Sequence, residues 1–304
     1  MYHYVREFRE SHPNFRFLDV DNFRKQLDYF EKNFGFVSKS EWDLVLKNRN
    51  LGSVKNKVLL TFDDAMSCHY DYVFPELEKR GLWGIFYVPT MPYEKGKLLD
   101  VHRIQLLCGA YKGSELLKLL LDLLSEEMIP DKRIEEFRRE TYLTQKNYEG
   151  ITEFKQILNY YVSDEHRESL INKVAEKFGY LFEVEKFYVS EENLKKMSLS
   201  GNVIGSHTVT HPVMSKLTRS EQLIQIRSSF NFLNQIGCIK EKTYCHPYGG
   251  FYSFNKDTVD LLTAEEVMYS FSVESRDIEN KDLLNSLQYL PRFDCNEFPY
   301  GKAS

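Results

Sequence analysis

The sequence predicts an α/β fold built on parallel strands, with a block of helices inserted between two parts of the strand pattern. An apolar run at 57–62, an amphipathic segment at 70–80 and a second apolar run at 83–88 form a strand–helix–strand unit, whose strands pair in parallel. Between 106 and 196 glycine and proline become rare, and large apolar residues recur at helical spacing. Strand-like runs then resume. The length of 304 residues allows one large domain or two smaller ones.

The other elements follow from apolar periodicity and capping residues. Short apolar runs predict strands at 2–5, 202–206, 242–244, 269–273 and 288–292. Amphipathic segments predict helices at 21–34, 39–47, 218–233 and 255–263. Thr218 and Glu221 have the spacing of a capping box, and Ser38 or Ser40 can cap the helix at 39–47. We therefore expect one α/β domain over residues 1–304, with a helical insertion at 106–196.

Composition and charge are those of a globular protein. The chain has 22 Phe, 20 Tyr and 42% hydrophobic residues, which excludes intrinsic disorder, and its net charge of −5 offers no footprint for a nucleic-acid partner. The first ten residues lack the apolar core of a secretory signal, and no apolar run reaches the roughly 20 residues that a transmembrane segment needs. The five scattered cysteines show no CxxC spacing, which is typical of reduced thiols. We expect a soluble cytoplasmic protein.

Two adjacent carboxylates, Asp63 and Asp64, come directly after the first apolar run. Parallel α/β folds collect ligands at the carboxyl ends of their strands, and adjacent residues there point in different directions. One carboxylate could therefore hold a metal ion while the other faces a substrate. The alternative is a helix N-cap followed by an acidic first turn.

A second signal is the pair His207 and His211, which follows the predicted strand at 202–206. Histidines four residues apart can share one face of a helical turn and offer both imidazoles to one cation, and Pro212 ends that turn. Alone the pattern is weak, since surface histidines at this spacing are common. Together with Asp64 it supplies two imidazoles and one carboxylate, which is the ligand set of an open catalytic site.

A Pro-Tyr-Gly turn, Pro247–Gly249, follows the predicted strand at 242–244. Such a turn can present a backbone N–H to an oxyanion, so we include Tyr248 among the candidate catalytic residues. Taken by itself, the segment is more simply interpreted as an ordinary turn.

In this order the three segments resemble the motifs of the polysaccharide deacetylase family, also called the NodB-homology or carbohydrate esterase 4 family. Thr61-Phe-Asp-Asp64 matches its TFDD motif, His207-Thr-Val-Thr-His211 its H-[ST]-x-x-H motif, and Pro247-Tyr-Gly249 the end of its R-x-P-[YF]-G motif. The resemblance covers roughly 57–105 and 197–295. The predicted insertion explains why the first two motifs lie further apart than usual.

The resemblance implies a distorted (β/α) barrel of about seven strands and a divalent metal ion, usually Zn²⁺. It further implies that Asp64, His207 and His211 hold the metal and that Asp63 is the general base. The family removes N- or O-acyl groups, mostly acetyl groups of N-acetylated amino sugars. The residues agree with this chemistry, because a metal with three protein ligands can polarise a carbonyl and lower the pKa of water, and a nearby carboxylate can take the proton.

Two features of the family pattern are missing. Cys245 stands where the third motif usually has an arginine that partners the catalytic aspartate, and 290–294 contains no histidine where the family has one. We expect Arg292, at the end of the last predicted strand, to pair with Asp63 instead, because a barrel returns that strand to the same rim. The alternative is an exposed pair with a carboxylate such as Asp294.

The group that protonates the leaving amine is then unassigned. His102 is the first candidate and His246 the second, because either could lie near the rim of the barrel. His3 and His102 both flank strand-like segments, so either could line the cleft.

The sequence therefore predicts a metal-dependent hydrolase of carbon–nitrogen bonds other than peptide bonds, which removes an acetyl group from an N-acetylated amino sugar. A cytoplasmic enzyme of this kind would act on a nucleotide- or lipid-linked intermediate of surface-polysaccharide biosynthesis. Two rival functions remain: a deformylase or other C–N hydrolase on the same barrel, and a catalytically idle barrel that binds glycans.

Overall fold

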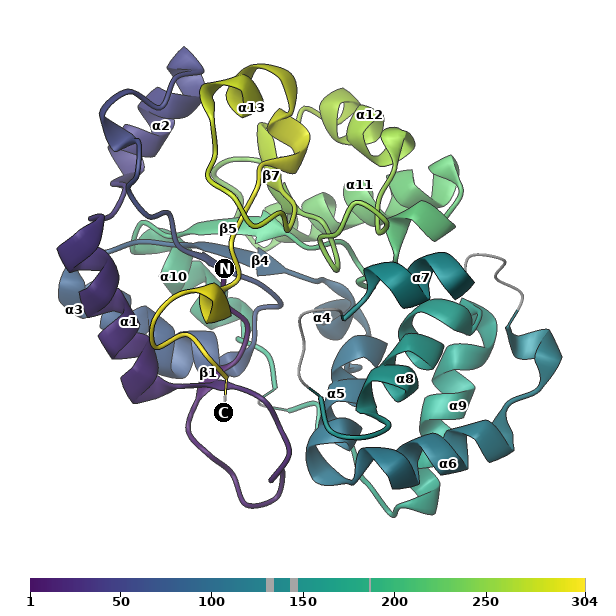
Figure 1. Cartoon of the computed structure of the whole chain (residues 1–304). Coiled ribbons are helices and arrows are strands. Elements are labelled where there is room, and N and C mark those ends of the chain that lie inside the picture. The colour runs from purple at the N-terminus through teal and green to yellow at the C-terminus, as the bar shows by residue number, and fades with distance from the viewer. Residues whose placement is uncertain (130–133, 143–146, 186, 304) are drawn as a thin grey trace. The chain divides into compact units, whose positions relative to one another are not determined.

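The computed structural model describes residues 1–129, 134–142, 147–185 and 187–303, and it divides into two compact units (Figure 1). The first unit comprises Met1–Glu7, Phe17–Gly96 and Glu185–Ser304, and the second comprises Phe8–Arg16 and Lys97–Val184. Compactness alone does not define a domain. The single domain over residues 1–304, with its insertion at 106–196, therefore stays a prediction.

A parallel sheet forms the centre of the first unit and confirms the predicted α/β class. Its strands pair in chain order, each parallel to the next. They are β3 (Thr61–Phe62), β4 (Ile85–Val88), β5 (Val203–Ser206), β6 (Thr243–Cys245) and β7 (Tyr269–Phe271). All their residues are buried, because helices cover a parallel sheet on its outer side. A separate two-stranded sheet pairs β1 (Val5–Arg6) with β2 (Leu18–Asp19).

Two further segments extend the parallel sheet at its edges and curl it towards closure. Tyr2 makes a parallel bridge to Phe62 on one edge, and Leu290 makes one to Phe271 on the other. The N-terminal ammonium group of Met1 donates to the carbonyl of Phe293 at 2.7 Å, so the first and last segments meet. The five strands and the two bridged segments together correspond to the strands of the distorted barrel that the sequence predicted.

The predicted strand at 288–292 is the main correction to the element order. Leu287–Tyr289 is a 3₁₀ turn, and Leu290 alone bridges to β7. Pro291 follows directly, and a proline has no N–H to continue a ladder. The chain therefore leaves the sheet at this point, which brings Arg292 to its edge.

Helices surround the sheet of the first unit (Figure 1). They are α1 (Val20–Asn33), α2 (Lys39–Asn48), α3 (Phe74–Arg80), α4 (Met91–Lys95), α10 (Glu191–Leu199), α11 (Arg219–Gln235), α12 (Lys256–Ala264) and α13 (Asn280–Asn285). A π-helical turn, η2 (His69–Val73), precedes α3. The capping box of Thr218 and Glu221 is confirmed, and Ser38, with Glu41, is the residue that caps α2.

Aromatic rings fasten the N-terminal segment to the sheet. The ring of Phe62 stacks on Phe86 at a centroid distance of 4.7 Å and on Tyr2 at 5.2 Å. The ring of Phe23, from α1, meets Tyr2 edge-on at 5.2 Å. Such ring pairs add to the stability that their burial already provides, so the first residues of the chain lie in a fixed place beside β3.

The second unit is helical. Its helices are α5 (Asp100–Ala110), α6 (Gly113–Leu123), α7 (Ile134–Glu140), α8 (Ile151–Gln156) and α9 (Asp164–Lys177). Helix α6 packs against α8 and α9, and α5 packs against α9. The segment Phe8–Arg16 belongs to the same unit, with Asn14 N–H donating to the carbonyl of Gly109. The sequence did not connect that segment with these helices.

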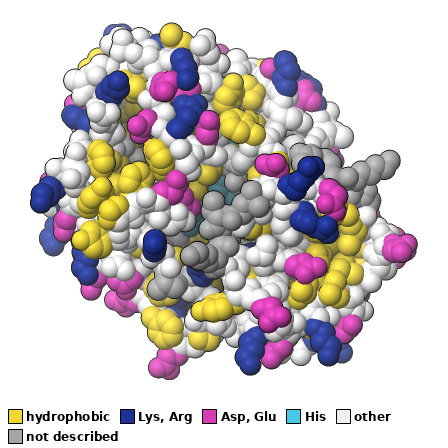
Figure 2. Space-filling model, viewed as in Figure 1, with side chains coloured by type: hydrophobic (Ala, Val, Ile, Leu, Met, Phe, Trp, Pro, Cys, Tyr) yellow, Lys and Arg dark blue, Asp and Glu magenta, His cyan; other side chains and the backbone are white. Residues whose placement is uncertain are grey.

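Charged side chains of both signs are spread over the surface. Figure 2 shows basic and acidic side chains interspersed over the face that it presents. Among the described residues, none of the helices has both the length and the apolar character that crossing a membrane requires.

Candidate active site

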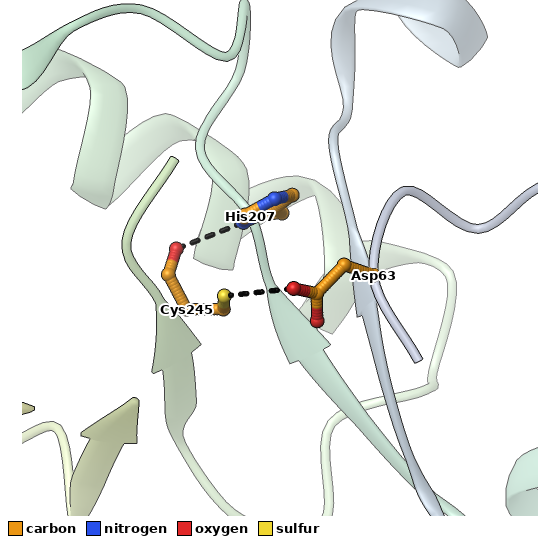
Figure 3. A group of neighbouring side chains, drawn as sticks. All are labelled: Asp63, His207 and Cys245. Carbon is orange, nitrogen blue, oxygen red and sulfur yellow. Dashed lines mark hydrogen bonds between the residues drawn. The ribbon is translucent and has the colours of Figure 1, made fainter. Parts of the chain in front are cut away.

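Strands of the parallel sheet bring the predicted site residues to one edge. Asp63 follows β3, His207 follows β5, and Cys245 is the last residue of β6. Because the strands are parallel, their carboxyl ends meet at the same edge, where such sheets collect ligands. Figure 3 shows the three side chains turned towards one another from separate strands.

Asp64, His207 and His211 form a compact group of buried metal-binding side chains. One donor atom from each lies within 4.8 Å of those of the other two. Asp64 Oδ1 lies 3.5 Å from His207 Nε2 and 3.8 Å from His211 Nε2. Two imidazoles and one carboxylate suit Zn²⁺ and leave ligand positions open for a reaction. The residues therefore fit the divalent metal that the sequence predicted, and the identity of the ion stays a prediction.

The two carboxylates are not helix caps. The helical turn that follows them, η2, begins at His69 and has Cys68 at its N-cap. Asp64 and Ala65 have left-handed backbone conformations, with φ of 79° and 49°. Such conformations are costly for a residue with a Cβ atom and cluster at functional sites. They bend the chain between β3 and η2, so that neighbouring carboxylates can serve different partners.

The histidine pair lies on a loop before Pro212, as the sequence predicted, but its two rings do not share the face of a helical turn. Thr208 and His211 have left-handed φ values of 66° and 55°. The side chain of Gln225 accepts hydrogen bonds from the N–H groups of Val209 and Thr210, which holds the loop in this shape. The imidazole centroids of the pair are 4.7 Å apart. A reversal of the backbone, and not helical periodicity, brings the rings together.

The backbone of Cys245 fixes which nitrogen of His207 faces the metal position. His207 Nδ1 lies 2.9 Å from the Cys245 carbonyl oxygen, which can only accept a hydrogen bond (Figure 3). Nδ1 therefore carries the proton, and Nε2 is left as the ligand atom beside Asp64. Burial lowers the pKa of His207, with the carboxylates of Asp64 and Asp63 acting against it, so the ring is neutral, as a ligand must be.

A second group of possible ligands, Asp63, His207 and Cys245, overlaps the first. The guanidinium of Arg292 already lies in it, with Nη2 2.9 Å from both Asp63 Oδ2 and Cys245 Sγ. A second cation at this position would be repelled. Because the proton on His207 Nδ1 also turns Nε2 towards Asp64, we assign the metal to the group with His211.

Arg292 is buried and uses all five of its N–H donors. Nε donates to the carbonyl of Ser272 and Nη1 to Thr61 Oγ1, at 3.1 and 3.0 Å. Nη1 and Nη2 also donate to the two oxygens of Asp63, both at 2.9 Å, and Nη2 donates to Cys245 Sγ. The expected pairing of Arg292 with Asp63 is therefore present, in the two-bond geometry that a guanidinium allows.

The same pairing keeps Asp63 ionised. Burial alone would raise the pKa of this carboxyl group, but the charge and hydrogen bonds of Arg292 hold the pKa well below its usual range. Burial raises the pKa of Cys245 far above its ordinary value, so this residue is a thiol and not a thiolate. Its Sγ lies 3.5 Å from Asp63 Oδ2, to which it can donate.

The turn after β6 lies beside the histidine pair. Tyr248 has a left-handed φ of 61°, and its ring centroid is 4.7 Å from that of His211. Gly249 has a φ of 71°, and a Cβ atom there would lie 2.3 Å from Val273 Cγ2, so only glycine fits. The place of Tyr248 in the catalytic set stays a prediction.

The two histidines proposed as proton donors, His102 and His246, belong to different units of the structure. Side chains alternate across a strand, and His246, next to Cys245, turns away from Asp63. Its ring stacks on Phe254 at 3.9 Å, and its Nε2 lies 2.7 Å from the carbonyl of Gln288. Burial lowers its pKa to about 3, and its role as a proton donor stays a prediction. His102 lies in α5 of the second unit, where it is buried, and its role stays a prediction.

His3 is the histidine that the structure places at the site. Its Nε2 lies 4.0 Å from Asp64 Oδ2, and its side chain is 40% exposed. The sequence analysis allowed it to line the cleft but did not choose it. The signal that could have singled it out is its place next to Tyr2, whose apolar run pairs with the strand that ends at Asp63.

Comparison with protein families supports the same assignment. Residues 163–269 match the polysaccharide deacetylase family, a span that contains His207, His211 and Cys245. This match supports the predicted resemblance to the polysaccharide deacetylase family. Members of that family are hydrolases of carbon–nitrogen bonds other than peptide bonds, and this polysaccharide deacetylase-like chain is an enzyme of that class.

Solved structures show the same fold. The Streptococcus pyogenes deacetylase PplD in complex with acetate superposes with a TM-score of 0.57 at 16% sequence identity, covering 96% of this chain and 89% of that one. BC0361, a polysaccharide deacetylase from Bacillus cereus, superposes with a TM-score of 0.50 at 14% identity, covering 96% and 62%. No curated protein sequence matches the chain.

Replacing both metal-site histidines tests the metal assignment. The double variant His207→Ala, His211→Ala should bind no zinc after loading and desalting, because one carboxylate is too weak a ligand by itself. Elemental analysis should find one zinc per wild-type chain and one per His166→Ala control, which removes a histidine of the second unit. Full zinc occupancy in the double variant would contradict the assignment.

Replacing Arg292 tests the ion pair. Arg292→Ala leaves the buried Asp63 carboxylate without its partner and should lower the free energy of unfolding by about 3–5 kcal/mol. Arg292→Lys keeps the charge but cannot form two bonds to the carboxylate, so its kcat should fall more than its zinc content. Urea unfolding, zinc analysis and turnover measure these effects.

The matched control is Arg276→Lys, since Arg276 makes two hydrogen bonds to Asp282 in the same unit but is only half-buried. Because the Arg276 side chain is 32% exposed and a lysine there can still pair with Asp282, Arg276→Lys should lower the free energy of unfolding by about 1 kcal/mol or less, with kcat unchanged. Equal turnover in Arg292→Lys and wild type would show that the two-bond geometry has no part in catalysis.

Proposed function

We propose that the chain is a metal-dependent deacetylase that removes the acetyl group from an N-acetylated amino sugar. The observation that carries this proposal is the ligand group of Asp64, His207 and His211 with a second carboxylate, Asp63, held beside it by Arg292. A divalent ion in the ligand group would polarise the acyl carbonyl and lower the pKa of water.

Asp63 is the proposed general base. It accepts the proton of the water molecule that attacks the acyl carbon, which requires an ionised carboxylate in a fixed orientation. Arg292 supplies both conditions, since it lowers the pKa of Asp63 and binds both carboxylate oxygens. Tyr248, whose ring lies against that of His211, stands in a turn that can direct a backbone N–H at the developing oxyanion.

His3 is the proposed proton donor to the leaving nitrogen. An amine leaves as a neutral molecule only if it gains a proton as the C–N bond breaks. Among the histidines that the structure describes near Asp64, His3 is the one outside the ligand group that is also open to solvent. Its imidazole can therefore reach substrate and be reprotonated from water.

The proposed substrate is an acetylated sugar of a surface polysaccharide or of an intermediate in its assembly, including nucleotide- or lipid-linked forms. The family match supports a polysaccharide-type substrate. The idle-barrel alternative drew on the missing third-motif arginine and on the missing terminal histidine, and Arg292 in contact with Asp63 weighs against the first of these. Cytoplasmic location stays a prediction from the sequence.

Product analysis tests the reaction and separates the two carboxylates. The zinc-loaded enzyme should release acetate and free amine in equal amounts from N-acetylglucosamine oligomers or from a nucleotide-linked N-acetyl sugar. Asp63→Asn should keep its zinc and lose about 10²–10⁴-fold in kcat, whereas Asp64→Asn should lose the zinc itself. Release of formate from N-formyl sugars alone would contradict deacetylation, and zinc loss only in Asp63→Asn would reverse the two roles.

The leaving group tests the role of His3. His3→Ala should lower kcat on the acetylated amino sugar by about 10²-fold or more, because the amine needs a proton. The same variant should hydrolyse 4-nitrophenyl acetate at the wild-type rate, since nitrophenolate leaves without one. Equal losses on amide and ester would show that His3 has a different part in the site.

A further inference from the structure

A second histidine holds the backbone of His3. His69 is the first residue of η2, five residues after Asp64, and it is fully buried. Its Nε2 lies 2.6 Å from the carbonyl oxygen of His3. A carbonyl only accepts hydrogen bonds, so Nε2 carries the proton and donates it.

The ring of His69 is fixed in this orientation. Its centroid lies 5.7 Å from the ring of Phe62 on β3 and 5.9 Å from that of Phe86 on β4. Burial lowers the pKa of His69 to about 4, so the ring stays neutral throughout the pH range in which the Nε2–H donor is needed. The donor is therefore supported directly by the central sheet.

The environment of His69 is unfavourable for a purely structural histidine. Its Nδ1 is buried and has no hydrogen-bond partner among the described residues. A buried polar atom without a partner costs free energy, and an apolar side chain between Phe62 and Phe86 would avoid that cost. Of the two ring nitrogens of His69, only Nε2 makes a hydrogen bond, and that bond is the one to the His3 carbonyl.

The hydrogen bond completes a series that fixes the chain at His3. The N–H of Tyr2 donates to the carbonyl of Thr61, and the N–H of Asp63 donates to the carbonyl of Tyr2, both at 2.9 Å. The next carbonyl along the chain is that of His3, which His69 holds. With its backbone held on both sides, the His3 side chain is directed at Asp64.

We propose that His69 is a positioning residue, which holds the backbone of His3 so that the His3 imidazole stays beside Asp64. This proposal rests on the proton-donor role of His3 proposed above. His69 does not touch substrate; it acts through His3. Misplacing a catalytic group by about 1 Å can lower a rate by about 10²-fold, so the effect is measurable.

The test compares variants with and without the donor. His69→Leu removes the N–H and should lower kcat on the acetylated amino sugar by about 10–100-fold. Its KM, its zinc content and its rate on 4-nitrophenyl acetate should match those of wild type. His69→Gln, whose side-chain amide can still donate, should recover most of the lost kcat. Ser198→Ala is the matched control, because it removes another buried donor to a backbone carbonyl, that of Cys238, and should leave kcat unchanged.

A double variant separates this proposal from the one on which it rests. In a His3→Ala background, His69→Leu should cause no further loss of amide turnover, because both changes remove the same proton transfer. Wild-type kcat in His69→Leu, or equal losses on amide and ester, would overturn the positioning role while His3→Ala remained defective. Full amide turnover in His3→Ala alone would instead overturn the proton-donor role, and the positioning role with it.

Discussion

The buried guanidinium of Arg292 joins the last segment of the sheet to residues of β3, to the end of β6 and to the residue after β7, and the geometry of the site depends on it. Its donors reach Thr61 and Asp63 at β3, Cys245 at the end of β6 and Ser272 after β7. A buried charge persists only when it is paired and its donors are satisfied, and here every donor has a partner. Closure of the curled sheet and orientation of the Asp63 carboxylate therefore depend on the same interaction.

Arg292 also divides the site into two halves, one that holds its guanidinium and one whose residues fit a metal ion. Arg292 occupies the half formed by Asp63 and Cys245, and the half formed by Asp64 and His211 is left for a metal. His207 stands between them, and its hydrogen bond to the Cys245 carbonyl turns its Nε2 to the metal half. Cys245, at the end of β6, thus contacts Arg292 through its Sγ and sets the tautomer of His207 through its carbonyl oxygen.

The sequence predicted that Asp63, Asp64 and His207 would lie together, because each follows a strand. Parallel strands place their carboxyl ends at the same edge of the sheet, independent of the shape of the loops. The pairing of Arg292 with Asp63 could be expected on the same ground. The shape of the loop from His207 to His211 could not, because left-handed backbone at Thr208 and His211 has no signal in residue spacing. The hydrogen bond of His246 to the Gln288 carbonyl could not be predicted either, because it joins segments far apart in the chain. The same holds for the contacts of His3 with Asp64 and His69, which lie about sixty residues further along the chain.

The most direct test of this division is X-ray absorption at the zinc edge of the loaded protein. The first shell should contain only nitrogen and oxygen, with zinc–nitrogen distances of about 2.0–2.1 Å from two imidazoles. Arg292→Ala should leave that shell unchanged, since the guanidinium lies outside it. A sulfur neighbour at about 2.3 Å in the wild-type protein would place Cys245 on the metal and contradict the account.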